Sequence, residues 1–112
     1  MDPVYINLEE GLGRIRGNKS LYKRMLQMYL ASPEFEKLET CFNANDAKGA
    51  AEVSHAIKGM VGNLGLTALF EISTALMNSF RAGNWDEALI DSYRLAEKET
   101  RIAVNETLTT LD

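Results

Sequence analysis

The stretch from Ser54 to Leu66 holds the residues best suited to chemistry in this sequence of 112 residues. It reads SHAIKGMVGNLGL and contains His55, the only histidine of the chain. Lys58 follows three residues later, and Gly59 and Gly62 come after it. Imidazole is neutral over much of the range around pH 7, and the neutral ring is a nucleophile. A lysine nearby can offset the negative charge of a group transferred to that ring.

An α-helix over this stretch would sort its residues onto two faces. On a helical wheel of about 100° per residue, Gly59 and Gly62 fall within about 40° of His55. Lys58 lies about 60° from the histidine, on its flank. The apolar residues occupy the opposite side, between about 140° and 240°: Val53, Ile57, Met60, Val61 and Leu64. The pattern predicts an outward histidine beside bare helix backbone, where another protein can approach closely.

The glycines are costly if they lie inside a helix. Each one destabilises a helix interior by about 0.8–1.0 kcal/mol relative to alanine. A helix that ends near Gly59, with Gly62 and Gly65 in a loop, would avoid this cost. The apolar period continues past Gly59 through Met60 and Val61 to Leu64, and this favours an unbroken helix to about Leu64.

The composition indicates one globular domain over residues 1–112, with 46 % hydrophobic and 25 % charged residues. A net charge of −4 argues against a general nucleic-acid binder. The single cysteine, Cys41, excludes an internal disulfide and suits a reducing compartment. No apolar run approaches the ~20 residues that span a bilayer, and the opening MDPVYINLEE is unlike a signal peptide. We therefore expect a cytoplasmic protein without a membrane segment, and the start at Met1 and end at Asp112 favour a free-standing domain.

Helical periodicity runs through the chain, and no strand-like alternation stands out. The expected helices cover Asn7 to about Ile15, Lys19 or Ser20 to about Phe42, Asp46 to Leu64, Thr67 to Arg81, and Trp85 to near the C-terminus. The short joints between the long helices predict an all-α fold, an antiparallel up-down four-helix bundle. The short first helix would pack over one end of this bundle.

The second helix poses two questions. Its expected inward face consists of Leu21, Met25, Met28, Phe35, Leu38 and Phe42. Pro33 would remove the hydrogen bond to the carbonyl of Tyr29. Because the apolar stripe keeps its phase across Pro33, we favour one bent helix over two helices with Ser32 capping the second.

The same helix also carries Tyr22, Leu26 and Tyr29, so it is apolar over a wide arc. Tyr22 and Leu26 are candidates for a hydrophobic docking patch near His55. Burial under the first helix is an equal alternative. A basic cluster lies nearby and either steers acidic partners or is simply a solvated face: Arg14, Arg16, Lys19, Lys23 and Arg24.

The segment resembles the signature of the histidine-containing phosphotransfer (HPt) domain family. That signature is a histidine, two residues, Lys-Gly, several small residues and then glycine. His55, the pair Lys58-Gly59 and Gly65 stand at the matching positions, and Gly62-Asn63 suits the small and polar positions between them. The resemblance extends over nearly the whole chain.

The sequence departs from the family pattern at one place. The fourth helix of the family usually carries an acidic residue after a leucine, whereas here Leu76 is followed by Met77 and Asn78. This departure leaves the phosphorylated position untouched, and we expect any effect in partner contacts or in the support of the motif helix.

The resemblance implies that the chain is a phosphoryl carrier rather than a turnover enzyme. His55 would accept a phosphoryl group on Nε2 from the aspartate of one receiver domain and pass it to another. Lys58 would stabilise the phosphate charge. The candidate docking residues are Gly59, Gly62, Asn63, Tyr22 and Leu26.

The resemblance also implies what binds the chain. No cofactor or metal would be bound by the chain itself, because the receiver supplies the acidic pocket and the Mg²⁺. The implied partners are receiver domains of response regulators or of a hybrid sensor histidine kinase, and stand-alone members of the family are usually monomeric.

Other functions remain open at this point. A lone histidine in a bundle is often only a surface or packing residue. A non-catalytic adaptor would keep the bundle and bind receivers or kinases without being phosphorylated. The phosphoacceptor segment of a histidine kinase carries an acidic residue after its histidine, whereas Ala56 follows here. A metal-binding bundle would need several Glu and His ligands.

Overall fold

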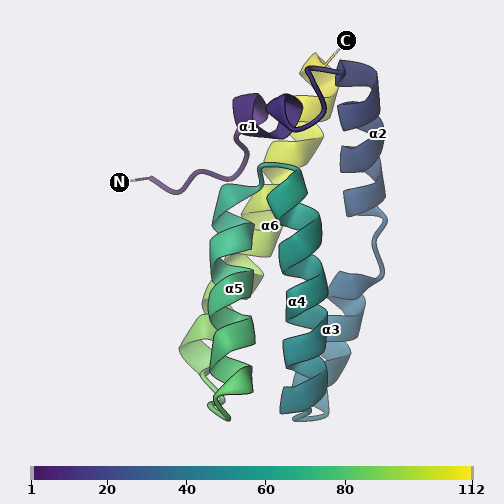
Figure 1. Cartoon of the computed structure of the whole chain (residues 1–112). Helices are drawn as coiled ribbons and strands as arrows, with labels where there is room; N and C mark the ends of the chain where they lie inside the picture. Colours follow the sequence, from purple (N-terminus) through teal and green to yellow (C-terminus); the bar gives the residue numbers. More distant parts are fainter. Residues whose placement is uncertain (1, 112) are drawn as a thin grey trace.

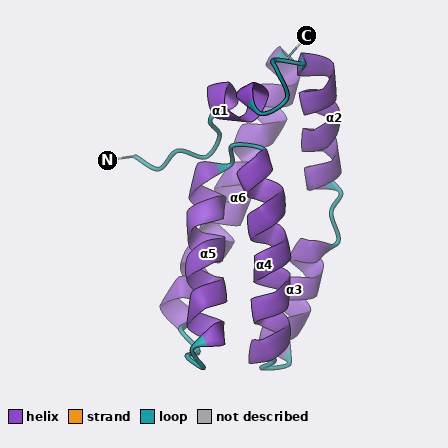
Figure 2. Ribbon diagram, in the orientation of Figure 1, coloured by secondary structure: helices purple, strands orange, loops and turns teal. Residues whose placement is uncertain are grey.

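Six α-helices make up the fold in the computed structural model of this chain, which describes residues 2–111 (Figure 1). They are α1 (Leu8–Gly13), α2 (Lys19–Leu30), α3 (Glu34–Asn43), α4 (Ala47–Asn63), α5 (Thr67–Arg81) and α6 (Glu87–Thr110). No strand occurs within residues 2–111, so the predicted all-α class is confirmed (Figure 2). Over the same residues, no helix combines the length and the apolar character needed to cross a membrane.

The helices form four antiparallel arms (Figure 1). The first arm consists of α2 followed by α3, and α4, α5 and α6 make the other three in alternating direction. The short α1 lies across the end of the bundle where α4 passes into α5. This arrangement confirms the predicted up-down four-helix bundle with an extra N-terminal helix.

Side-chain caps explain where most of the helices begin. A short polar side chain that accepts a backbone N–H satisfies one of the donors left free in the first helical turn. The acceptors here are Asn7 for α1, Asn18 for α2, Asp46 for α4 and Asp86 for α6, at 2.9–3.2 Å. At the other end of α4, Gly65 has a φ of +74°, a left-handed conformation that favours glycine.

The expectation of one bent helix across Pro33 is wrong, because two separate helices occupy that arm. Pro33 has no N–H to continue the α2 ladder. Ser32 N instead donates to Tyr29 O at 3.1 Å, and Lys37 N donates to Pro33 O at 3.1 Å to start the new ladder. The Ser32 hydroxyl accepts from Glu34 N at 3.3 Å. The alternative of two helices is therefore correct, but the N-cap residue of α3 is Pro33 and not the predicted Ser32.

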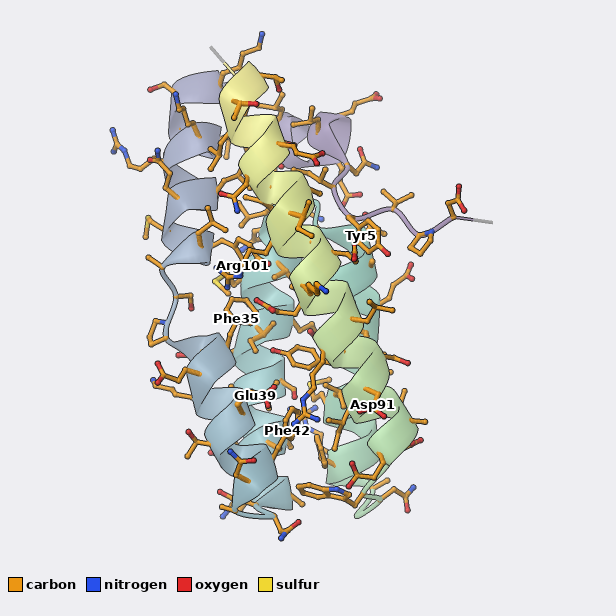
Figure 3. The ribbon with its side chains drawn as sticks, turned by 180° about the vertical axis from the view of Figure 1, so that it is seen from behind. Tyr5, Phe35, Glu39, Phe42, Asp91 and Arg101 are labelled. Carbon is orange, nitrogen blue, oxygen red and sulfur yellow. The ribbon has the colours of Figure 1, made fainter. Side chains whose placement is uncertain are left out.

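Arg101 of α6 contacts the residues on both sides of the break between α2 and α3 (Figure 3). Its Nη1 donates to the carbonyl of Leu30 at 3.0 Å, which satisfies a carbonyl at the end of α2. The guanidinium also lies over the rings of Tyr29 and Phe35, at 5.8 and 5.7 Å from their centroids. The ion pair with Glu97, at 2.9 Å, orients it. The break is thus a fixed joint tied to the longest helix.

The inward face of α2 also differs from the expectation. Leu21 and Met28 are 37 % and 66 % exposed, whereas Tyr22, Leu26 and Tyr29 are fully buried. Both sides of the helix are apolar, and the buried side is the one that packs into the main core, where Tyr22 also lies against Gly11 of α1. The expected inward residues of α3, Phe35, Leu38 and Phe42, are buried as predicted.

Candidate functional site

Helix α4 presents His55 on its outer face, as the wheel predicts. His55 is exposed, whereas Ile57 and Val61 are fully buried. The helix continues without interruption through Gly59 and Gly62 to Asn63. The prediction of an unbroken helix to about Leu64 is therefore confirmed, with Leu64 as the C-cap.

The residues singled out on this helix line one shallow pocket of about 290 Å³. Two further residues from other elements complete its lining. The lining consists of His55, Lys58, Gly59, Gly62 and Asn63 of α4, Arg14 from the end of α1, and Phe70 of α5. The packing of three elements thus brings cationic and aromatic side chains to the exposed histidine.

The two glycines beside His55 have different surroundings. A Cβ at Gly59 would meet nothing within 4 Å, so its backbone is open to an approaching partner. A Cβ at Gly62 would stand 3.0 Å from Cδ1 of Phe70. The face at Gly62 is thus already occupied by the Phe70 ring, and the bare surface predicted from the wheel is limited to Gly59.

Lys58 rests on the same aromatic ring. Its Nζ lies 5.9 Å from the centroid of Phe70, within the range of a cation–π interaction. Within residues 2–111, none of the ion pairs involves Lys58. Its charge is therefore held at the rim of the pocket and is available to an anion placed near His55.

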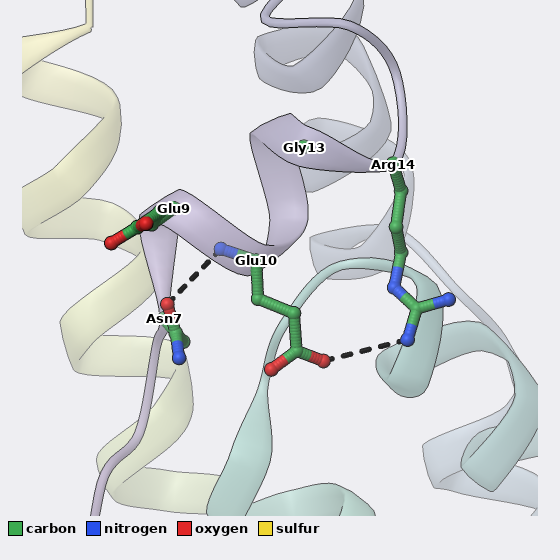
Figure 4. Close-up of a pocket in the computed structure, with 5 residues that line it drawn as sticks. All are labelled: Asn7, Glu9, Glu10, Gly13 and Arg14. Atoms are coloured by element: carbon green, nitrogen blue, oxygen red, sulfur yellow. Dashed lines mark hydrogen bonds and ion pairs between the residues drawn. The ribbon is translucent and has the colours of Figure 1, made fainter.

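Arg14 adds a second cation from outside the helical hairpin. Its Nη2 lies 3.5 Å from Oε1 of Glu10, with the two side chains 50 % and 46 % exposed (Figure 4). An exposed pair of this kind contributes little stability. The guanidinium can therefore exchange Glu10 for another carboxylate or phosphate. The sequence places Arg14 in a basic cluster, but only the packing of α1 brings it to the histidine.

Met77 of α5 contacts the imidazole directly. Its Sδ lies 3.4 Å from Nδ1 of His55, and the side chain is only 5 % exposed. The sequence marks Met77 as a departure from the family pattern and provides no signal for this contact, which spans 22 residues of chain.

Tyr22 and Leu26 do not form a docking patch, because both are fully buried. Tyr22 lies beneath Gly11 and donates its hydroxyl hydrogen to the carbonyl of Leu64 at 2.6 Å. Burial raises the pKa of Tyr22 to about 12. The alternative of burial under the first helix therefore holds for Tyr22.

The exposed apolar surface of α2 lies on the side of the helix that carries Met25 and Met28. An open groove of about 460 Å³ runs between α2, the α2–α3 break and α4. Met25, Met28 and Met60 line it together with Pro33 and Asn63. Asn63 also lines the pocket of His55, so the methionine groove adjoins the histidine pocket. The prediction of Tyr22 and Leu26 as docking residues is therefore wrong, and the methionine groove is a separate candidate surface beside the histidine pocket.

The part of the chain that the structure describes contains no cluster of three or more His, Cys, Asp or Glu side chains suited to a metal ion. His55 has a thioether on one side, and Lys58 and Arg14 are the charged residues among those that line its pocket. This environment suits a negatively charged group on the imidazole.

Fold and site together define a class of protein: an up-down helical bundle that presents its single histidine on the outer face of one helix. The family model of the Hpt domain matches residues 24–111, and the chain belongs to this family. The matched segment covers the four arms from within α2 onward and leaves out α1. Comparison with curated proteins and with solved structures finds no match. Hpt domains are phosphocarrier modules of two-component systems that interact with receiver domains and kinases.

Proposed function

We propose that this chain is the histidine phosphotransfer protein of a multistep phosphorelay. His55 accepts a phosphoryl group from the aspartate of one receiver domain and passes it to the aspartate of another. The observation that carries this proposal is the exposed imidazole on α4, beside the open backbone of Gly59, in a member of the Hpt family. The chain acts as a carrier, since it ends each cycle unchanged.

The transfer needs a nucleophile and a favourable charge environment. The lone pair of the His55 ring nitrogen attacks the phosphorus atom, the bond from phosphorus to the aspartate oxygen breaks, and the carboxylate leaves with the electron pair. Reversal of these events on a second receiver regenerates the free imidazole. Phosphoryl transfer depends on positioning and on neutralisation of charge. Lys58 supplies a positive charge one helical turn from the ring.

The receiver contributes what the histidine pocket lacks. In this proposal its acidic pocket and Mg²⁺ hold the aspartyl phosphate, and this chain binds neither a metal nor a cofactor. The open backbone at Gly59 lets that pocket approach the imidazole in line. Docking extends from the histidine pocket across Asn63 onto the exposed Met28 and the partly buried Met25 and Met60 of the adjoining groove. Apolar contacts of this kind, with flexible methionine side chains, suit a surface that binds more than one receiver.

A two-step relay tests the proposal. A receiver is phosphorylated with acetyl phosphate that carries a labelled phosphoryl group, and it is mixed with the purified chain. The chain is then isolated, and a second receiver with Mg²⁺ is added. We expect the label to move onto the chain and then onto the second receiver. If the chain binds several phosphorylated receivers and never takes label, it is an adaptor and the proposal fails.

A further inference from the structure

We propose that Met77 is a positioning residue, whose thioether fixes the tautomer of His55 and leaves Nε2 as the attacking nitrogen. This inference rests on the proposed phosphotransfer function and adds the group that orients the nucleophile. The evidence is the 3.4 Å contact between Met77 Sδ and His55 Nδ1.

The contact has a fixed hydrogen-bond polarity. A thioether sulfur carries no hydrogen, so it can only accept a hydrogen bond. A neutral imidazole carries one proton, on either Nδ1 or Nε2. The contact is attractive when the proton is on Nδ1, and Nε2 then holds the free lone pair. A proton on Nε2 would place two lone pairs, those of Nδ1 and the sulfur, against each other.

The position of the sulfur is well determined by packing. Met77 lies on α5 and is 5 % exposed, between the fully or nearly fully buried Ser73 and Phe80 of the same helix. Helices α4 and α5 pack side by side along their length (Figure 1). Nδ1 therefore faces the interior of the helix pair, while the exposed part of the ring faces the pocket of Lys58 and Gly59. A group that binds the inner nitrogen orients the outer one, as the partners of metal-bound and catalytic histidines do.

A thioether orients the ring without taking its proton. When Nε2 attacks phosphorus and the aspartate leaves, the Nδ1 proton remains and the phosphorylated ring is a cation. Sulfur is a weak acceptor and no base under these conditions, so it does not remove that proton. The cationic ring remains a good leaving group for the second transfer. A carboxylate in this place would stabilise the charged free ring as well, and would thereby lower its nucleophilicity.

Methionine also fills gaps in cores, and such packing alone would explain its burial. The two roles differ in one respect. A packing residue is replaced by leucine with little effect on the ring, because leucine is close to it in volume. A residue that acts as a hydrogen-bond acceptor cannot be replaced in this way, because leucine accepts no hydrogen bond.

Side-chain ¹⁵N NMR tests the inference, and the single histidine makes the spectrum unambiguous. We expect wild type to be mainly the Nδ1–H tautomer and Met77→Leu to shift toward Nε2–H. The transfer rate of Met77→Leu should fall by about 10–100-fold at unchanged receiver affinity, as for other lost orienting groups. Met77→Gln, which restores an acceptor, should recover both the tautomer and the rate. Circular dichroism of each variant checks that the bundle is folded.

Two results would overturn the inference. The first is a wild type in which Nε2 carries the proton, and the second is the same tautomer population in wild type and Met77→Leu. The tautomer measurement needs no receiver, so it is independent of the proposed function. If wild type shows the Nδ1–H tautomer and yet never takes label, the phosphotransfer function fails and the role of Met77 in transfer fails with it.

Discussion

The ring of Phe70 packs against the backbone of Gly62, so that a Cβ at Gly62 would stand 3.0 Å from the ring. Gly59, one turn earlier on the same face of α4, has only open space around it. The two glycines are equivalent on a helical wheel and different in the structure. Gly62 makes room for the aromatic side chain that supports Lys58, and Gly59 keeps the surface beside His55 open.

This difference predicts that alanine substitutions at Gly59 and Gly62 change the stability of the bundle by unequal amounts. Gly59→Ala should stabilise the bundle by about 1 kcal/mol, because alanine favours an exposed helix interior. Gly62→Ala should be about 1 kcal/mol less stabilising than Gly59→Ala, because the Phe70 ring must move away from the new methyl group. Urea unfolding of both variants measures this difference in the free energy of unfolding. The difference should vanish when Phe70→Ala is added to each, and equal effects in the presence of Phe70 would contradict the packing role of Gly62.

The two cations of the pocket should affect different steps. Lys58 lies one turn from the ring, so Lys58→Ala should lower the maximal transfer rate by about tenfold, or about 1.4 kcal/mol. Arg14 lies on α1, and Arg14→Ala should mainly weaken receiver binding, more strongly at low salt. Rates measured against receiver concentration separate the two effects. Lys98→Ala, an exposed lysine of α6, is the control and should behave as wild type.

The methionine groove should be part of the receiver interface. Met28 is 66 % exposed, so Met28→Glu should leave the stability within about 0.5 kcal/mol of wild type. Receiver affinity should fall by about tenfold, because a charge would be desolvated in an apolar contact. Leu95→Glu is a matched control, since Leu95 is 59 % exposed on α6, outside the groove. Equal affinities of the two variants for a receiver, measured by calorimetry, would exclude the groove from docking.

The buried tyrosines predict alkaline unfolding. Burial raises the pKa of Tyr22 to about 12, and it also raises the pKa of Tyr29 and Tyr93. In the unfolded chain the tyrosine hydroxyls ionise at about pH 10. The folded chain therefore holds protons that the unfolded chain releases, so the free energy of unfolding falls as pH rises from about 10 toward 12.

Substitution of Tyr22 identifies its share of this effect. Tyr22→Phe removes the hydrogen bond to the Leu64 carbonyl and should cost about 1 kcal/mol at neutral pH. The same variant should lose stability less steeply above pH 10, since one titrating group is gone. Urea unfolding between pH 7 and pH 11 measures both. A slope as steep as that of wild type would show that Tyr22 does not titrate with unfolding.

The features that local sequence determines were predicted well. Asn7 and Asp46 start helices because their side chains accept a nearby backbone N–H. The outward direction of His55 follows from the apolar period of its own helix. These signals act within one or two helical turns, so no knowledge of the tertiary packing is needed.

The features that depend on packing between helices were not predicted. Helix α2 is apolar around a wide arc, and which side is buried depends on its contacts with other helices, such as that of Tyr22 with Gly11 of α1. Pro33 breaks the arm without a loss of phase, so periodicity could not reveal the break. The neighbours of His55 from α1 and α5 are distant in sequence, and Met77 carried no signal for its contact with the ring.

The proposed function requires that His55 itself carries the phosphoryl group. Wild type and His55→Gln are incubated with labelled, phosphorylated receivers, and the label on each chain is followed. We expect label on wild type alone, lost in acid and stable in alkali, with His55→Gln folded and unlabelled. Equal labelling of the folded His55→Gln variant, or acid-stable label on wild type, would show that His55 is not the phosphorylated residue.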